Sequence, residues 1–286
     1  MTRKVRIRKN RKKEIPLSER EAAMAAQDQI IKDALSLVKH KFIVMSGKGG
    51  VGKTSVAANL AMALSRQGAR VGLMDVDLHG PDIPRILGLS GVLEASVDGR
   101  ITPKPYSENL EVVSVGSMAG DPDKAVIWRG PLKLQVIRRF ISDVHWGLLD
   151  YLIIDSPPGT GDEPLTVAQN IPDAKAIIVT MPQEMSLGDV RKSINFCKQV
   201  HMKITGVVEN MSGFVCPHCG KNIPIFGKGG GKGMADQIGI PFLGEIPLDP
   251  QMVEMGDTGK LDALAEMSDL EINKVYEEIV NRILNA

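Results

Sequence analysis

The segment GKGGVGKT, residues 47–54, constrains this chain more than any other feature. It matches the GxxxxGK(S/T) pattern of a phosphate-binding loop, in which backbone N–H groups surround phosphate oxygens. An apolar run at residues 42–45 precedes it, and a stretch without Gly or Pro follows at 53–67, so the loop joins a predicted strand to a predicted helix. We therefore expect a nucleotide site at the edge of an α/β sheet.

The side chains of this loop have separate expected roles. Lys53 would contact the β and γ phosphates, and the Thr54 hydroxyl would ligate Mg²⁺. Lys48 has no obvious place on the same nucleotide once Lys53 is there, so it is predicted to act across a dimer interface as a trans-acting cation. The candidate nucleotide-binding residues of the loop are Gly47, Lys48, Gly49, Gly50, Val51, Gly52, Lys53, Thr54 and Ser55.

Beyond residue 41, short apolar runs alternate with helical stretches, which predicts a doubly wound, mostly parallel α/β sheet of the P-loop NTPase type. Strands are expected at 42–45, 70–74, 110–115, 151–154, 176–180, 205–209 and 242–245, and helices at 53–67, 132–144, 187–200 and 270–284. The expected organisation is a basic disordered tail at 1–18, a helix at 19–40 and an ATPase domain at 41–286. A second glycine-rich segment, GKGGGKG at 227–233, follows no predicted strand and is interpreted as a flexible turn.

Three aspartates stand at predicted strand ends. Asp75 and Asp77 follow the second strand, and Asp155 ends the fourth. The carboxyl ends of parallel strands meet at one edge of a sheet, so these carboxylates are expected beside the phosphate loop, with Asp77 and Asp155 joining Thr54 in a magnesium site. The turn at 159–161 is a candidate switch that senses the γ phosphate.

Charge and hydropathy limit the function classes. Eight bases lie in the first thirteen residues, and the remainder has 27 bases against 34 acids, the wrong sign for a dedicated nucleic-acid surface. No apolar run reaches the ~18 residues of a membrane span, and no apolar region follows the basic start as in a secretory signal. The expected location is the cytoplasm, with neither a membrane nor nucleic acid as partner.

Cys216 and Cys219 form a CxxC pair, whereas Cys197 lies in a predicted helix and is expected to be buried. Two thiolates are half of the four ligands that zinc or an iron-sulfur cluster takes. Three interpretations stay open: a metal centre shared by two subunits, a redox pair, and a zinc site within one chain that adds His218.

The motifs together resemble the Mrp/ApbC family of iron-sulfur cluster carrier ATPases. The residues that carry the resemblance are GKGGVGKT, DVDLHGPDIPRILG at 75–88, DSPPGTGDEPLT at 155–166, ENMS at 209–212 and CPHCG at 216–220, and the match covers about 41–284. The resemblance implies that Lys48 is the signature lysine of a deviant Walker A loop, that Asp77 orients the attacking water and that Asp155 is the Walker B aspartate. It also implies that Asn210 contacts adenine.

The same resemblance makes Cys216 and Cys219 the ligands of a 4Fe-4S cluster bridging a homodimer. The expected cofactors are ATP, Mg²⁺ and that cluster, and the expected partners are apo iron-sulfur proteins and a cluster scaffold. Some members of that family carry an accessory domain or a four-cysteine segment before the ATPase, and we expect neither here, because only a basic tail and one predicted helix precede residue 41. Three alternatives stay open: a ParA/MinD-like positioning ATPase, a zinc-bridged nucleotide-binding scaffold and a nitrogenase-like reductase.

Overall fold

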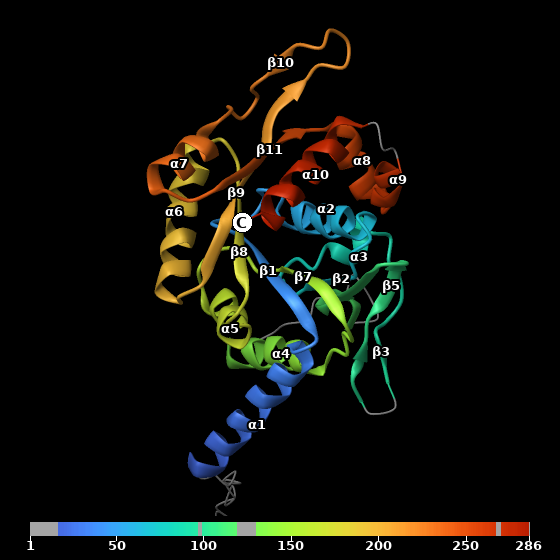
Figure 1. Ribbon diagram of the computed structural model, residues 1–286, viewed down its shortest axis with the longest axis vertical. Coiled ribbons are helices and arrows are strands. Elements are labelled where there is room, and N and C mark those ends of the chain that lie inside the picture. Colours follow the sequence, from blue (N-terminus) through green and yellow to red (C-terminus); the bar gives the residue numbers. More distant parts are fainter. Residues whose placement is uncertain (1–16, 97–98, 119–129, 267–269, 286) are drawn as a thin grey trace, which may run out of the picture.

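The computed structural model describes residues 17–96, 99–118, 130–266 and 270–285, and Figure 1 shows the arrangement of their elements. The strands are β1 (Val38–Ser46), β2 (Val71–Asp75), β3 (Glu94–Ala95), β4 (Ile101–Thr102), β5 (Lys104–Ser107), β6 (Leu110–Ser114), β7 (Leu149–Asp155), β8 (Lys175–Thr180), β9 (Lys203–Val215), β10 (Asn222–Ile223) and β11 (Phe242–Leu248). The helices are α1 (Leu17–Leu35), α2 (Lys53–Arg66), α3 (Ile83–Ile86), α4 (Gly130–Asp143), α5 (Asp162–Asn170), α6 (Glu184–Gln199), α7 (Gly230–Ile238), α8 (Pro250–Thr258), α9 (Leu261–Glu266) and α10 (Glu271–Leu284), with a 3₁₀ turn at Val115–Met118.

The main sheet has the order β10-β9-β8-β1-β7-β2-β6-β5, and β11 pairs with β9. Every pairing among β1, β2, β6, β7, β8, β9 and β11 is parallel, and only β5 and β10 add antiparallel partners. The predicted mostly parallel α/β fold is confirmed. Because β1 lies between β7 and β8, the chain winds outward in both directions from the strand that precedes the phosphate loop.

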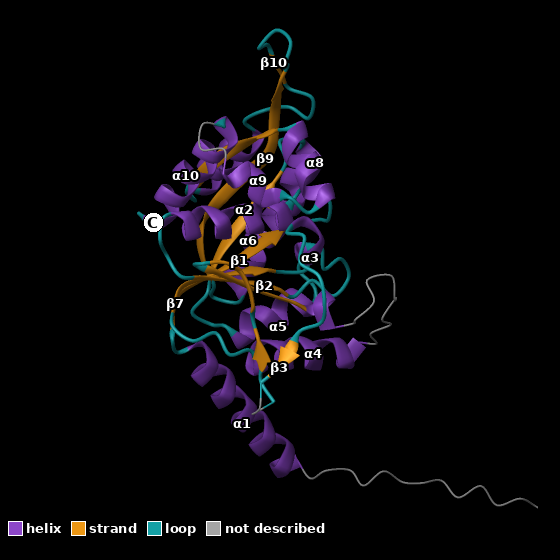
Figure 2. Ribbon diagram, turned by 90° about the vertical axis from the view of Figure 1, so that its right-hand side faces the viewer, coloured by secondary structure: helices purple, strands orange, loops and turns teal. Residues whose placement is uncertain are grey.

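Each face of the sheet is covered by its own helices, as Figures 1 and 2 show from two sides. Side chains alternate along a strand, so Ile43 and Met45 of β1 enter one core while Phe42 and Val44 enter the other. The first core is closed by residues of α1, α4, α5, α6 and α7, and the second by residues of α2, α3 and α10. Because the inner strands are buried on both faces, they are almost wholly apolar.

The N-terminal boundary differs from the expectation. The predicted helix at 19–40 instead runs from Leu17 to Leu35, and β1 begins at Val38, four residues before the predicted strand. Lys39 and Lys41 form ion pairs with Asp150 and Asp173, so a polar segment could extend a strand that hydropathy alone starts at residue 42. Most of the basic tail, residues 1–16, lies outside the described residues.

Strand β9 is much longer than the predicted 205–209. Its first part pairs with β8, and its end pairs with the short strand β10, which forms an antiparallel hairpin. We call residues 213–226 of this hairpin the cysteine arm. The arm projects from one end of the molecule, opposite the end from which α1 projects (Figures 1 and 2).

The second glycine-rich segment is not a flexible turn, so that expectation is wrong. Its residues from Gly230 onward form the first turns of α7, and Gly229 takes the left-handed conformation (φ 79°) at the helix N-cap. Glycine has a low helix propensity, so the local sequence argues against a helix that the tertiary contacts nonetheless hold in place. In the described parts of the chain, no helix is long and apolar enough to cross a membrane.

Candidate functional site: a phosphate loop and a separate cysteine arm

The phosphate loop lies at the carboxyl end of β1, as predicted, and Gly52 caps the N-terminus of α2. Gly50 and Gly52 both have φ 80°, a backbone conformation that side chains disfavour. Gly47 must be glycine for a different reason, because an added Cβ would lie 2.3 Å from the Asp189 carbonyl carbon of α6. The loop therefore combines two left-handed turns with close backbone packing, and Gly49 and Gly50 at its tip are exposed.

Lys53 is buried and lies among three aspartates. Its Nζ donates a hydrogen bond to Asp155 Oδ1 and lies 3.7 Å from Asp77 Oδ2. Asp75 and Asp155 are register partners on β2 and β7, which places the third carboxylate beside them. The convergence expected from the strand ends is thus observed.

The electrostatic consequences follow from burial. Burial raises the pKa of Asp75 well above its usual range, and the neighbouring Asp155 carboxylate raises it further, while a hydrogen bond from Ser114 Oγ at 2.7 Å opposes the shift. Burial also raises the pKa of Asp155, against the lowering effects of the Lys53 charge and the Thr54 side chain. With Lys53 as their cation the ionised forms of these two carboxyls are disfavoured, and a further cation beside them would favour ionisation.

The residues present fit a magnesium ion. Asp155 Oδ2 is buried and has no hydrogen-bond partner among the described residues, although Oδ1 is bonded to Lys53. A buried carboxylate oxygen without a partner is costly, and oxygen donors are what Mg²⁺ prefers. Thr54, half-buried in the first turn of α2, and Asp77 supply the other predicted oxygens. Ser55, the last predicted loop residue, is also half-buried there.

Two further predicted residues lie at the rim of the loop. Lys48 is half-buried, and its ammonium has no ion pair or hydrogen bond within the described part of the chain. Asn210 Nδ2 donates to the Val51 carbonyl at 2.9 Å, so this β9 residue touches the phosphate loop itself. The trans-acting role of Lys48 and the adenine contact of Asn210 stay predictions.

Sequence reasoning missed a polar cluster that joins the loops after β2 and β7. Glu163 Oε1 lies 3.1 Å from both His79 Nε2 and Lys133 Nζ. Asp77 Oδ1 accepts a hydrogen bond from the backbone N–H of His79 at 3.1 Å. Burial favours the protonated form of Glu163, but Lys133 and His79 outweigh it and hold the pKa of Glu163 below its ordinary value. The candidate switch turn lies nearby in the chain, with the Gly159 N–H bonded to the Ser46 carbonyl at 2.8 Å.

The two cysteines of the CxxC pair lie at the tip of the cysteine arm, beyond β9 and β10. The turn is closed by hydrogen bonds from Cys216 N–H to Lys221 O and from Gly220 N–H to Cys216 O. Backbone N–H groups of His218 and Cys219, and the Cys219 thiol, lower the pKa of Cys216. The pair is thus presented outward with one sulfur biased toward the thiolate, the form that binds metal.

The structure separates these cysteines from Cys197, which is fully buried on α6 as expected. Burial raises the pKa of Cys197 to about 11. Among the described residues, no group of three or more His, Cys, Asp or Glu side chains is placed to hold a metal, so His218 does not complete a site with Cys216 and Cys219 there.

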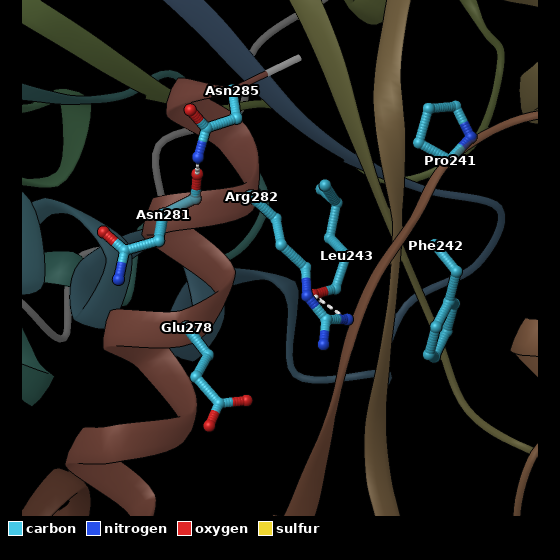
Figure 3. A pocket seen from close by; sticks show the side chains of 7 residues that line it. All are labelled: Pro241, Phe242, Leu243, Glu278, Asn281, Arg282 and Asn285. Atoms are coloured by element: carbon cyan, nitrogen blue, oxygen red, sulfur yellow. Dashed lines mark hydrogen bonds between the residues drawn. The ribbon is translucent and has the colours of Figure 1, made fainter.

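Two surface hollows lie along β11 and α10, away from the phosphate loop. The larger, of about 560 Å³, is drawn in Figure 3, where Arg282 Nη1 donates to the Leu243 carbonyl at 3.2 Å and Asn285 bonds back to Asn281. Neither hollow is lined by a predicted site residue.

Comparisons with known proteins agree with this geometry. The family model described as ParA, NUBPL iron-transfer P-loop NTPase, matches residues 37–284. The iron-sulfur cluster carrier protein of Methanocaldococcus jannaschii is 47% identical over 262 residues, covering 91% of this chain and 89% of that protein. The cytosolic Fe-S cluster assembly factor CFD1 of Saccharomyces cerevisiae is 44% identical over 262 residues, covering 87% and 89%.

Solved structures show the same fold. The nucleotide-binding protein of Archaeoglobus fulgidus, solved with ADP, has a TM-score of 0.73 at 38% identity and covers 83% of this chain and 93% of its own. The septum site-determining protein MinD of Pyrococcus horikoshii, solved with Mg-ADP, has a TM-score of 0.63 at 23% identity, covering 86% and 96%. At 23% identity, the similarity to the MinD structure shows only that the fold is shared.

Proposed function

Because the chain belongs to the family of NUBPL iron-transfer P-loop NTPases, we propose that it is a slow Mg²⁺-dependent ATPase that binds a 4Fe-4S cluster between two subunits and passes it to apo-proteins. The observation that carries the proposal is the pairing of two features in one chain. One is a complete phosphate loop with its acidic cluster, and the other is a CxxC pair, half-buried Cys216 and exposed Cys219, that supplies two of the four ligands a cluster takes.

The nucleotide half of the proposal rests on the phosphate loop. Its backbone N–H groups and the α2 N-terminus would receive the phosphates, and Lys53 would exchange part of its contact with Asp155 for a phosphate oxygen. Thr54, Asp77 and Asp155 would hold Mg²⁺, which supplies charge neutralisation at the transferring phosphoryl group. Asp77 would also orient the attacking water, and Asn210 would contact the base.

The cluster half of the proposal rests on the cysteine arm. Two subunits related by a two-fold axis would bring together Cys216 and Cys219 of each, which makes the four thiolates that a cubane cluster takes. The exposed position of the pair suits a cargo that must leave again. Exposed apolar side chains on the same arm, Val215, Ile223 and Ile225, would be covered by that association.

Lys48 is the residue through which nucleotide would favour the closed dimer. Its ammonium has no partner among the described residues, so it is available for a phosphate of the other subunit. Nucleotide can change the hold on the cluster only as far as it binds two dimer arrangements with different affinity. Relatives named as cytosolic assembly factors support the same compartment for this chain.

Cluster transfer tests the proposal. The protein is loaded anaerobically and mixed with an apo-enzyme whose activity needs a 4Fe-4S cluster, in the presence of an iron chelator that removes free iron. We expect Mg-ATP to speed activation by the wild type, and we expect no activation with Cys219→Ala. Equal activation by Cys219→Ala, or by iron and sulfide alone at the same rate, would contradict the proposal.

A further inference from the structure

Glu209 is a fully buried carboxylate without a cationic partner among the described residues. Its Oε1 accepts hydrogen bonds from Ser212 Oγ at 2.5 Å and from the Gly229 N–H at 2.8 Å, and its Oε2 accepts one from the Gly231 N–H. We call these four residues the Glu209 clasp. The second glycine-rich segment thus surrounds a carboxylate of the chain itself, much as a phosphate loop surrounds a phosphate, with the positive end of α7 toward the charge.

The clasp joins the two places where the cysteine arm leaves and re-enters the body of the protein, which we call its roots. Glu209 and Ser212 lie on the strand that leaves the body, and Gly229 and Gly231 lie where the chain returns to it. Between Ser212 and Gly229 lie the cysteine arm, residues 213–226, and the two residues that follow it, Gly227 and Lys228. A second contact nearby, the ion pair of Lys228 with Glu245 at 3.4 Å, ties the returning segment to β11.

The residue after Glu209 holds the phosphate loop. Asn210 Nδ2 donates to the Val51 carbonyl, and a Cβ on Gly52 would lie 2.2 Å from that same nitrogen. Adjacent residues of a strand point to opposite faces, so one short stretch of β9 is bonded to the phosphate loop on one face and to α7 on the other. Any displacement of the loop at Val51 is therefore passed through Asn210 to the strand that carries the clasp.

We propose that Glu209 is a positioning residue that makes both roots of the cysteine arm move with the phosphate loop, so that nucleotide state reaches Cys216 and Cys219. The inference rests on the proposed function, because it assumes that nucleotide and cluster sites communicate. Without the clasp, the returning segment would lose its bonds to Glu209 and keep the Lys228–Glu245 ion pair to β11, so it would follow the loop less closely than the outgoing strand does. With it, the arm shifts as one unit.

Two alanine substitutions in the same helix separate this role from general stability. A Cβ at Gly231 would lie 2.9 Å from Glu209 Oε2 and 3.0 Å from Thr180 Cγ2, whereas a Cβ at Gly233 would have no heavy atom within 4 Å. Both substitutions give α7 the same gain in helix propensity, and only Gly231→Ala pushes on the clasp. Glu209→Gln removes the charge while keeping the shape, and Ser212→Ala removes one hydrogen bond and leaves the glycines in place.

The test is amide hydrogen exchange of the full chain, without nucleotide, with Mg-ADP and with Mg and a non-hydrolysable ATP analogue. We expect nucleotide to change exchange in the arm of the wild type and of Gly233→Ala. In Gly231→Ala and Glu209→Gln, nucleotide affinity should stay within about twofold, exchange in the arm should be about tenfold faster, and its response to nucleotide should be lost. Ser212→Ala should show a partial loss of that response.

The inference is overturned if the arm of Gly231→Ala and Glu209→Gln responds to nucleotide as the wild type does, or if the wild-type arm does not respond at all. Should Gly231→Ala fail to fold, Glu209→Gln and Ser212→Ala decide, and an unchanged response in both counts against the clasp. Iron loading of the wild type is measured on the same samples. A wild type that responds to nucleotide but binds no cluster contradicts the proposed function and leaves the role of Glu209 standing.

Discussion

The phosphate loop and the cysteine arm differ first in how they are packed. Lys53 and Asp77 are 6% exposed and Asp155 is fully buried, whereas Cys219 and its neighbours at the arm tip are exposed. Charge is held in place around the loop by α2 and by strands buried on both faces, while the arm is a two-stranded hairpin with solvent around it. The groups around the loop come together within a single chain, whereas the described part of the arm tip brings together only two cysteines, which the proposed cluster would share with a second subunit.

The largest effect should come from removing the lysine at the centre of the buried site. Lys53→Ala leaves Asp75 and Asp155 without their cation, so we expect nucleotide binding to be lost and the free energy of unfolding to fall by about 3 kcal/mol. Lys41→Ala is the matched control. Lys41 lies on β1, is as buried as Lys53, and pairs with Asp173. The substitution should destabilise the protein and leave nucleotide affinity unchanged. Titration calorimetry with ADP and urea unfolding measure both quantities, and wild-type affinity in Lys53→Ala would refute the account of the site.

Lys48→Ala should separate catalysis from binding. Since Lys48 has no partner within the described residues, its loss should leave stability unchanged, and a monomer should still bind ADP. Hydrolysis should fall by about a thousandfold if the lysine acts across the dimer as a trans-acting cation does. Single-turnover hydrolysis of Mg-ATP is the measurement, with the exposed Lys198→Ala as the comparison. A hydrolysis rate in Lys48→Ala equal to that of Lys198→Ala would remove the trans-acting role.

The thiols should divide sharply by reactivity. With its pKa raised to about 11, Cys197 is about one part in a thousand thiolate at pH 8, and it is also buried, whereas the pKa of Cys216 is lowered. Iodoacetamide should therefore alkylate Cys216 and Cys219 of the metal-free protein about a hundredfold or more faster than Cys197. Mass spectrometry of tryptic peptides over time shows this. Comparable labelling of all three would mean that α6 opens as readily as the arm.

The smallest effect concerns pH and Asp75. Its pKa is raised on folding, so the folded chain keeps a proton that the unfolded chain releases above about pH 4, and the stability from this residue falls as pH rises through the folded pKa. Asp75→Asn does not titrate, so its stability relative to wild type should increase by about 1 kcal/mol between pH 4 and 8. Asp150→Asn is the control of opposite sign, because bonds from Lys39 and Arg70 lower the pKa of Asp150. Urea unfolding at several pH values decides, and parallel curves for wild type and Asp75→Asn would show that folding does not raise the pKa of Asp75.

The sequence predicts the buried site better than the arm, for a physical reason. Strand ends of a parallel sheet share one edge, so placing Asp75 and Asp155 on strands was enough to bring them to Lys53. The length of β9 depends on pairing with β11 and β10, strands that lie far along the chain or hold only two residues. Within β9, Met211 has a positive φ (57°), which is not the backbone conformation of a regular strand. The alternation of side chains that marks a strand in the sequence is therefore interrupted just after Glu209.

Helix α7 shows the same limit. Its first turns are glycines that the sequence alone would leave as a turn, and what fixes them is the carboxylate of Glu209 some twenty residues earlier. The glycine-rich segment itself could have predicted this contact. It would have to be interpreted as an anion-binding loop whose anion is a carboxylate of the same chain. Ser114 was missed because it belongs to no motif, although it donates a hydrogen bond to Asp75. Glu163 lies within the motif at 155–166, but its partners His79 and Lys133 are far from it in the sequence, so no spacing marks their cluster.

We propose that one chain combines a complete nucleotide site with two of the four ligands of a cluster, and iron stoichiometry is the measurement that decides this. After anaerobic reconstitution with iron and sulfide, the wild type and Cys197→Ala should elute as dimers with about four irons per pair. Cys216→Ala and Cys219→Ala should elute without iron while their nucleotide affinity is unchanged. A monomer that retains iron, a dimer with one zinc in its place, or iron retained by Cys219→Ala would contradict the claim.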